Sequence, residues 1–279
     1  MPELAEVEVG RKVAEGAVAG RRLIRVECAD DPIVFDGLSP AMVRDALEGA
    51  EVRAVHRHGK QLWFELDRRP HPLFHFGMTG AFRVPGEPAI DLESGLRDDG
   101  SWPPRFTKIH LVAEGGSELV MTNARRLGRI RLRNDPPMEP PLSQLGFDPL
   151  WGMPRFPEFE RRLGARKLPL KALLLDQSFA AGVGNWLADE ILYQARLDPR
   201  RPANALEADE IRRLHAKLKK IVRTAVDVDA DKSRFPRTWL FHKRWGKKAG
   251  NIAGHPIEHL TIGGRTTAWV PALQRQDVG

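Results

Sequence analysis

The sequence has only one cysteine, Cys28, which excludes an intrachain disulfide and any zinc site built from several thiols. It also lacks any run of about 18 apolar residues, so no membrane span is expected. The first residues lack the basic and then apolar pattern of a signal peptide, which favours the cytosol. Hydrophobic residues make up 42% and charged residues 29% of the 279 residues, as in a globular protein with a substantial core.

The positive charge is concentrated at one end of the chain. The net charge is +7, and residues 232–279 carry nine Lys and Arg residues against only Glu258 and Asp277. This segment alone accounts for the whole excess, which is typical of a module that binds a polyanion such as nucleic acid. A solvated basic tail is the alternative, but three tryptophans within the segment favour a folded unit.

The residue pattern of the first half changes from helical to β-type. Residues 3–18 have the apolar spacing of a helix, and residues 22–133 contain short β-type runs separated by turns. Several short strands in series indicate an antiparallel sandwich. Five of the expected strands are Leu23–Cys28, Val52–His56, Gln61–Leu66, Phe106–Val112 and Glu118–Thr122.

The second half begins after a break that is rich in proline. Asn134–Pro141 is the candidate linker, and residues 156–226 have helical periodicity. Between two of these helices lies Gly182-Val-Gly-Asn185, whose glycines let backbone amides approach a phosphate, although such a pair often makes only a turn. From about residue 232 the pattern predicts loops and a β-hairpin, with Gly263-Gly264 as its turn.

Several ordered motifs resemble those of the formamidopyrimidine-DNA glycosylase/endonuclease VIII family. The opening Met-Pro-Glu-Leu-Ala-Glu-Val-Glu is similar to the N-terminus of that family. Each further motif is weak evidence alone, but six motifs in the same order across almost the whole chain are specific evidence for the family. They are Arg57-His-Gly-Lys60, His75-Phe-Gly-Met-Thr-Gly80, Asn123-Ala-Arg-Arg-Leu-Gly128, Leu173-Leu-Leu-Asp-Gln177, Gly182-Val-Gly-Asn185 and Gly263-Gly-Arg265.

The resemblance implies an α+β multidomain fold. An N-terminal helix and an antiparallel β-sandwich are expected to form a catalytic domain over residues 1–134, followed by a linker over residues 135–155. A helix–two-turn–helix DNA-binding domain is expected over residues 156–231. Residues 232–279 are expected to form a β-hairpin finger.

The same resemblance identifies Pro2 as the catalytic nucleophile. An α-amino group has a pKa of about 7.7–8.0, so about a tenth of it is free base at pH 7, whereas a lysine offers only about one part in 2,500. A helix N-terminus behind Pro2 further disfavours the ammonium form. Met1 would block this chemistry, so its removal is required. Without the family motifs, Pro2 has the simpler interpretation of a proline in the first position of a helix.

Two acids lie one helical turn apart beside Pro2. By resemblance Glu3 is the general acid/base, Glu6 is a helper and Glu8 is structural. The residue types alone also fit acids placed favourably at a helix N-terminus. Lys60 completes the set of catalytic residues that the resemblance implies.

Phosphate contacts position DNA without reading its sequence. Taken singly, the lysines among the candidates would be interpreted as solvated surface residues. By resemblance, five residues make such contacts: Lys60, Lys171, Asn185, Arg126 and Arg265.

A glycosylase extrudes the damaged nucleotide, and other side chains must fill the gap. By resemblance, Met78, Arg125 and Leu127 have this role. Leucine replaces the phenylalanine that is usual in the formamidopyrimidine branch, which weakens a stacking wedge. Without the resemblance, Met78 and Leu127 would be assigned to the core.

The finger departs from the family pattern. Family members commonly carry four zinc-binding cysteines spaced C-x2-C-x16-C-x2-C, and here the spacing is kept although all four thiols are absent. We therefore expect a zincless finger held by packing, with no cofactor. The four matching positions are Gly250, Ala253, Val270 and Leu273. The alternative is zinc bound by histidines of this segment, without an evident fourth ligand: His242, His255 and His259.

The sequence leaves the lesion open. Val226–Phe235 is shorter than the loop that caps oxidised purines in the formamidopyrimidine branch, whereas Met78 and Arg125 are typical of that branch. The expected function is a bifunctional glycosylase/AP lyase that excises oxidised bases through a Schiff base on Pro2 and cuts the strand by β,δ-elimination. Formamidopyrimidines and other oxidised purines are the favoured substrates. The alternatives are an endonuclease VIII-like enzyme for oxidised pyrimidines and a non-catalytic protein that binds damaged DNA.

The expected partner is double-stranded DNA that contains oxidised bases or abasic sites, bound by a monomer without membrane attachment. The expected location is the cytoplasm, at the nucleoid of a bacterium, or the nucleus of a eukaryote.

Overall fold

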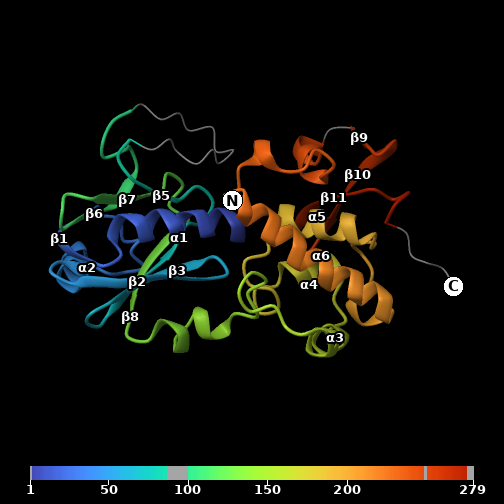
Figure 1. Cartoon of the computed structure of the whole chain (residues 1–279), viewed down its shortest axis with the longest axis horizontal. Helices are drawn as coiled ribbons and strands as arrows, with labels where there is room; N and C mark the ends of the chain where they lie inside the picture. Colours follow the sequence, from blue (N-terminus) through green and yellow to red (C-terminus); the bar gives the residue numbers. More distant parts are fainter. Residues whose placement is uncertain (1, 87–99, 248–249, 275–279) are drawn as a thin grey trace. The chain divides into compact units, whose positions relative to one another are not determined.

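The computed structural model describes residues 2–86, 100–247 and 250–274 (Figure 1). The chain divides into two compact units, Met1–Gln144 and Leu145–Gly279. Their boundary lies inside the predicted linker. The predicted helical domain and finger belong to the same unit, so the expected division at residue 232 does not separate two compact bodies. Among the described residues, no helix is both long and apolar enough to cross a bilayer.

The first unit is built on antiparallel strands. Its described residues form an eight-stranded sheet in the order β5-β7-β6-β1-β2-β3-β4-β8. The strands are β1 (Arg21–Cys28), β2 (Glu51–His58), β3 (Gln61–Leu66), β4 (His71–His75), β5 (Ala81–Arg83), β6 (Thr107–Ala113), β7 (Glu118–Thr122) and β8 (Arg129–Arg133). The helices are α1 (Leu4–Val18) and α2 (Pro40–Leu47), with short 3-10 helices η1 (Pro136–Met138) and η2 (Leu142–Gln144).

The sheet folds back on itself through β1. Arg21 and Arg22 pair with β2, whereas the rest of the strand pairs with β6. Phe82 of β5, at one end of the strand order, contacts Phe64 of β3 and Phe74 of β4 near the other end, with ring centroids 5.7 and 5.1 Å apart. The two halves therefore face each other across an aromatic core, which confirms the predicted antiparallel sandwich.

Helix α1 packs against strands of both halves of the sandwich (Figure 1). Its buried apolar residues recur every three or four positions, which places one face of the helix in the core. The prediction of a helix over residues 3–18 is confirmed, with Leu4 as its first residue. Helix α2 was not predicted, although Ser39 caps it by accepting a hydrogen bond from the N–H of Met42 at 3.2 Å.

The second unit begins with helices. They are α3 (Phe156–Gly164), α4 (Leu170–Leu175), α5 (Asn185–Ala195) and α6 (Ala208–Asp227), and α5 lies against α6 (Figure 1). The helical periodicity predicted over residues 156–226 is present in α6, where Ile211, Leu214, Leu218 and Ile221 form one buried apolar stripe. Short 3-10 helices follow at η3 (Ala203–Ala205), η4 (Lys232–Arg234), η5 (Leu240–His242) and η6 (Trp245–Lys247).

The second part of the predicted linker is integral to this unit. Phe147 is buried, and its ring lies 6.0 Å from that of Phe159 and 5.3 Å from that of Phe179. Residues 147–150 of the predicted linker are therefore buried in this unit, whereas Trp151 is 64% exposed.

The predicted finger is a three-stranded antiparallel sheet in the order β11-β10-β9 within the described residues. Its strands are β9 (Gly250–Ile252), β10 (His255–Ile262) and β11 (Arg265–Trp269), and the predicted turn at Gly263-Gly264 joins the last two. Both glycines have positive φ (56° and 71°), a conformation that side chains disfavour.

Candidate functional site

Pro2 stands immediately before the N-cap of α1. The helix begins at Leu4 and its N-cap is Glu3, so the interpretation of Pro2 as a first-turn proline is wrong. Glu3 and Glu6 form a capping box, in which the Glu3 N–H donates to Oε2 of Glu6 at 3.0 Å. Pro2 and Glu3 are both buried, with Glu3 only 4% exposed. The backbone therefore fixes the predicted general acid directly beside the predicted nucleophile.

The turn that carries Lys60 is tied to the same helix. Arg57 donates from Nε to Oε2 of Glu8 at 2.7 Å, and both side chains are almost completely buried. Arg57 also donates from Nη1 to the carbonyl of Gly59 at 3.0 Å. Removing one partner of such a buried pair costs about 3–5 kcal/mol. Glu8 thus has the structural role that was expected, and it anchors the β2–β3 turn.

The three predicted gap-filling residues lie on two loops that pack together, residues 76–80 and 123–128. Asn123 is fully buried and joins the loops. Its Nδ2 donates to the carbonyl of Phe76 at 2.9 Å, and its Oδ1 accepts from the N–H of Gly128 at 3.1 Å. One amide side chain therefore fixes both loops.

Close backbone contact makes glycine necessary in these loops. A Cβ on Gly77 would lie 2.4 Å from the backbone carbon of Leu127, and Gly77 has a positive φ of 64°. Leu127 itself is 43% exposed and Arg125 is exposed, while Met78 is half-buried. The interpretation of Leu127 as a core residue is wrong: the loop holds its side chain toward solvent.

The loop with Met78 also contacts α1. A Cβ on Gly10 would lie 2.6 Å from Cε2 of Phe76, so only a glycine lets the helix approach this ring. Within the first unit, α1 therefore contacts both the turn that carries Lys60 and the loop that carries Met78, and Asn123 joins that loop to the second one.

His75, at the root of the first loop, is held neutral. Its Nδ1 accepts a hydrogen bond from the N–H of Gly77 at 3.2 Å, which requires that this nitrogen carries no proton. Burial, and then the positive charge of Lys60, lower the pKa of His75 to about 4. His75 thus serves as a hydrogen-bond acceptor that shapes the loop.

Arg126, a predicted phosphate contact, makes a bidentate ion pair in this structure. Its Nε and Nη2 lie 3.0 and 2.9 Å from the carboxylate oxygens of Asp31, which also accepts from Lys108 at 2.8 Å. Burial opposes ionisation of Asp31, but the two cations outweigh it and hold its pKa well below the usual range. Asp31 was not predicted as part of the site, because Arg126 and Lys108 lie 95 and 77 positions away from it in the sequence.

In the second unit, Asn185 and the finger are joined. Asn185 is the first residue of α5, and its Nδ2 donates to the carbonyl of Thr266 at 3.0 Å. Arg265, the next residue back along β11, is exposed. Two predicted phosphate contacts that are 80 positions apart in sequence therefore meet at the start of one helix. The Oδ1 of Asn185 is buried and has no partner among the described residues.

Lys171, the remaining predicted phosphate contact of this unit, is completely buried. Its Nζ lies 2.5 Å from Oδ1 of Asp189 and donates to the carbonyl of Asn185 at 2.7 Å. Asp189 also accepts from Arg244 at 2.6 Å and from the N–H of Ala268 at 3.1 Å. The expected surface position of Lys171 is thus corrected: the lysine lies in an ion network that connects α4, α5 and the finger.

The four positions that match the missing zinc ligands do not share one environment. Val270 is fully buried in a cluster with Tyr193, Leu240, Ile257 and neighbours, and Leu273 packs against that cluster. The packing that was predicted for these two residues is confirmed. In the part of the chain that the structure describes, no group of three His, Cys, Asp or Glu side chains is placed to hold a metal. The three histidines of the finger segment therefore do not converge.

Comparison with known proteins places these features in one family. Residues 1–130 match the formamidopyrimidine-DNA glycosylase N-terminal domain, and residues 145–237 match the formamidopyrimidine-DNA glycosylase H2TH domain. A formamidopyrimidine-DNA glycosylase of Arabidopsis thaliana is 41% identical over 278 residues, which cover 99% of this chain and 71% of that protein. One of Thermus thermophilus is 36% identical over 290 residues, 98% of each chain. The chain belongs to the formamidopyrimidine-DNA glycosylase family.

Solved structures agree with the fold. The MutM (Fpg) protein of Thermus thermophilus is 35% identical, with a TM-score of 0.75 over 98% of both chains. The enzyme of Lactococcus lactis, bound non-covalently to DNA that contains an AP site, is 22% identical, with a TM-score of 0.79 over 98% of this chain and 100% of that one. The expected α+β fold with a sandwich, a helical region and a small hairpin sheet is confirmed.

Proposed function

We propose that this chain is a bifunctional DNA glycosylase and AP lyase of base-excision repair, with the amine of Pro2 as its nucleophile. The observation that carries the proposal is the start of α1. Pro2 lies outside the helix, and Glu3 is held at its N-cap by the capping box with Glu6. The free amine exists only after Met1 has been removed, so that removal is part of the proposal.

The proposed reaction begins at C1′ of the damaged nucleotide. The Pro2 nitrogen forms a bond to C1′ while the bond from C1′ to the base breaks, and the base leaves with a proton. Opening of the sugar then gives a Schiff base. Elimination expels the 3′ phosphate and then the 5′ phosphate, and water releases Pro2. Glu3 is the proposed general acid/base, because it is the residue that follows Pro2 and is buried with it.

The remaining residues position the DNA. Lys60, Arg126, Asn185 and Arg265 are proposed phosphate contacts, while Met78, Arg125 and Leu127 fill the gap left by the extruded nucleotide. Support for the latter comes from the rigid pair of loops and from the exposure of Leu127. Arg126 must exchange Asp31 for a phosphate if it is to take part.

The favoured substrates are formamidopyrimidines and other oxidised purines, and double-stranded DNA is bound by a monomer. One observation favours a second candidate, an endonuclease VIII-like enzyme for oxidised pyrimidines. Helix α6 ends at Asp227 and η4 starts at Lys232, so residues 228–231 make a tight turn with positive φ at Asp229 and Ala230. This turn leaves no chain for a long capping loop over a purine.

Excision assays on a panel of lesion duplexes test the proposal and separate the two candidates. Duplexes with 8-oxoguanine, formamidopyrimidine, thymine glycol, dihydrouracil or an abasic site would be incubated with the full chain. Faster release of the purine lesions is the expected result, and faster release of the pyrimidine lesions supports the second candidate. Binding without excision or strand cleavage on every duplex would instead identify a non-catalytic binding protein.

A further inference from the structure

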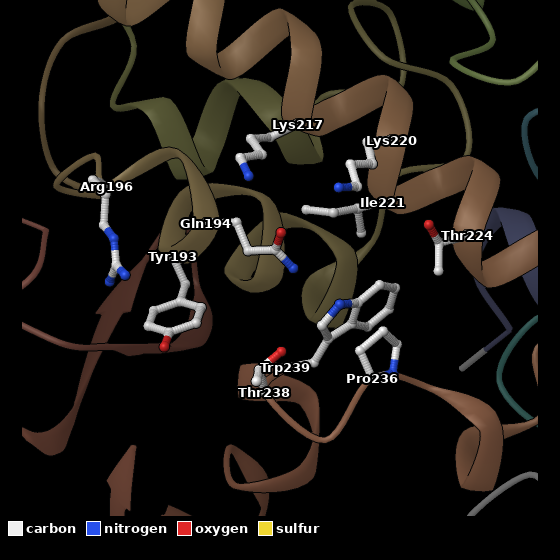
Figure 2. A pocket seen from close by; sticks show the side chains of 10 residues that line it. All are labelled: Tyr193, Gln194, Arg196, Lys217, Lys220, Ile221, Thr224, Pro236, Thr238 and Trp239. Atoms are coloured by element: carbon white, nitrogen blue, oxygen red, sulfur yellow. The ribbon is translucent and has the colours of Figure 1, made fainter. Parts of the chain in front are cut away.

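A pocket of about 330 Å³ lies within the second unit, between the C-terminal end of α5, the middle of α6 and residues 236–239 (Figure 2). Its volume is in the range of small-molecule sites, which is about 300–1,000 Å³. Lys217 and Lys220 of α6 and Gln194 of α5 point into the same space, opposite the ring of Trp239 (Figure 2). No residue assigned above to DNA binding or catalysis lines it.

The charged lining of this pocket has one sign. Arg196, Lys217 and Lys220 line it, and no Asp or Glu does. None of the three makes an ion pair with a described residue, and only Arg196 has another charge-related contact, 5.2 Å above the ring of Tyr193. By contrast, Lys171 and Arg244 in the same unit are paired with Asp189. Three unpaired cations around one cavity create a site for an anion.

Two aromatic rings also line the pocket, that of Tyr193 on α5 and that of Trp239 in the segment of residues 236–239. Trp239 and Tyr193 are 5% and 6% exposed, so their rings are fixed by the core and present only a limited surface to the pocket. Trp239 is held by Phe235 and Trp186, with ring centroids 5.0 and 6.4 Å away. Fixed aromatic rings beside cations favour a ligand that carries a flat ring as well as negative charge.

The pocket is separate from the Asn185–Thr266 contact and from Arg265. Asn185 is the first residue of α5, whereas Gln194 lies near its end, about 13 Å further along the helix axis. The cations of the pocket are therefore not part of the phosphate contacts at the start of α5.

We propose that this pocket binds a nucleotide. Its phosphate groups are bound by Lys217, Lys220 and Arg196, and its base lies against the small exposed surfaces of Trp239 and Tyr193. The Nε2 of Gln194 donates to Oε1 of Glu190 at 2.8 Å, so its Oε1 is the atom proposed to accept a hydrogen bond from the base edge. The nucleotide is either free in solution or one unit of a single-stranded nucleic acid, and the same contacts serve both.

Calorimetric titration of the full chain tests this proposal with ADP, pyrophosphate and a short single-stranded oligonucleotide. The test variant K217A/K220A removes two lining cations. The matched control K219A/R223A removes two exposed cations of the same helix that do not line the pocket. We expect ADP or the oligonucleotide to bind, and K217A/K220A to weaken that binding by at least roughly tenfold, since each charge-assisted contact contributes about that much or more. The control is expected to bind as wild type, and both variants to excise lesions as wild type.

The three probes distinguish a free nucleotide from a nucleic-acid strand. Loss of ADP binding identifies a free nucleotide as the ligand, and loss of oligonucleotide binding alone identifies a strand. The proposal is overturned if neither probe binds wild type, if pyrophosphate binds as tightly as ADP, or if the two double variants behave alike. It is also overturned if R265A rather than K217A/K220A abolishes binding, because the probe would then occupy the DNA contact. Since the readout is nucleotide affinity, failure here is distinguishable from failure of the proposed excision activity.

Discussion

A single carboxyl group at the start of α1 has two roles in this account. Glu3 caps the helix through its backbone and side chain, and it is also the proposed proton donor for base release. The Glu3→Gln variant keeps the shape of the side chain but cannot donate that proton, so excision should slow by roughly 10²–10⁴-fold. Affinity for lesion duplexes should stay close to that of wild type.

Single-turnover excision and duplex binding measured side by side check this prediction. Glu15→Gln is the matched control, since Glu15 lies on the same helix, its side chain is 50% exposed, and it pairs with Arg11 at 2.8 Å. Wild-type excision by the Glu3→Gln variant would refute the general-acid role.

Glu190 makes the stability of the protein depend on pH. Burial raises the pKa of this carboxyl group from 4.5 to about 7, against hydrogen bonds from Gln194 and from the N–H of Phe241. The folded protein therefore holds an extra proton between these values. Protonation of Glu190 therefore contributes fully to the free energy of unfolding below about pH 4.5. This contribution is lost as the pH rises from about 4.5 to about 7, and the total loss is at most about 3 kcal/mol.

Glu190→Gln should remove this decline, because a neutral amide matches the protonated carboxyl group and the amide of Gln194 can rotate to remain bonded. Denaturant unfolding at pH 5 and pH 8 measures the effect. The free energy of unfolding should differ less between the two pH values in the variant than in wild type. An equal difference in the free energy of unfolding between pH 5 and pH 8 in both proteins would show that folding does not raise the pKa of Glu190.

At the scale of elements, the start of α5 and the β10–β11 hairpin form one contact surface. Asn185 holds the carbonyl of Thr266, which places Arg265 at the same end of the helix. Arg265→Ala removes a charge-assisted phosphate contact, so duplex affinity should fall by about 1.5–3 kcal/mol, nearly uniformly across flanking sequences.

Duplex affinity measured over a range of salt concentrations checks this prediction. The slope of log affinity against log salt should become less steep by about one for Arg265→Ala. Lys219→Ala, an exposed cation on α6, serves as the control and should leave both quantities unchanged. A steeper or unaltered slope for Arg265→Ala would exclude a direct phosphate contact.

Most of the secondary structure could be predicted from the sequence, whereas the long-range ion pairs could not. Period and turn residues predicted α1, five of the eight strands described in the first unit, the periodicity of α6 and the hairpin turn, because these are local patterns. They did not reveal α2, which is only eight residues long, or the ion pairs Arg126–Asp31 and Lys171–Asp189. Those pairs join residues 95 and 18 positions apart, and neither periodicity nor spacing encodes such a contact. For this reason the buried ion pair of Lys171, which was predicted as a phosphate contact, could not be foreseen from the sequence.

At the scale of the whole molecule, each unit contributes a different part of the proposed activity. The first unit carries Pro2, Glu3 and the two proposed gap-filling loops, and the second carries Asn185 and Arg265, joined through the Asn185–Thr266 contact. The second unit is held by packing of Val270 and by the ions around Asp189, rather than by the four thiols that its relatives' pattern would supply. We propose that the finger folds without zinc.

Chelation tests the proposal of a metal-free finger. Incubation with a strong chelator should leave both the unfolding transition and the excision rate unchanged, because packing closes the hairpin. Elemental analysis of the purified protein is the companion measurement. Stoichiometric zinc, together with activity that is lost on chelation, would contradict the proposal and support zinc binding by the histidines of the finger segment.

The central claim is that the nitrogen of Pro2 forms the bond to the sugar, and covalent trapping tests it most directly. Borohydride reduces a Schiff base to a stable adduct, so the full chain would be treated with it on lesion and abasic duplexes. The adduct would then be located by peptide mapping. The account predicts an adduct on the N-terminal peptide at Pro2, and none when an uncleaved extension precedes that residue. An adduct on Lys60 or Lys171, or none on any duplex, would contradict it.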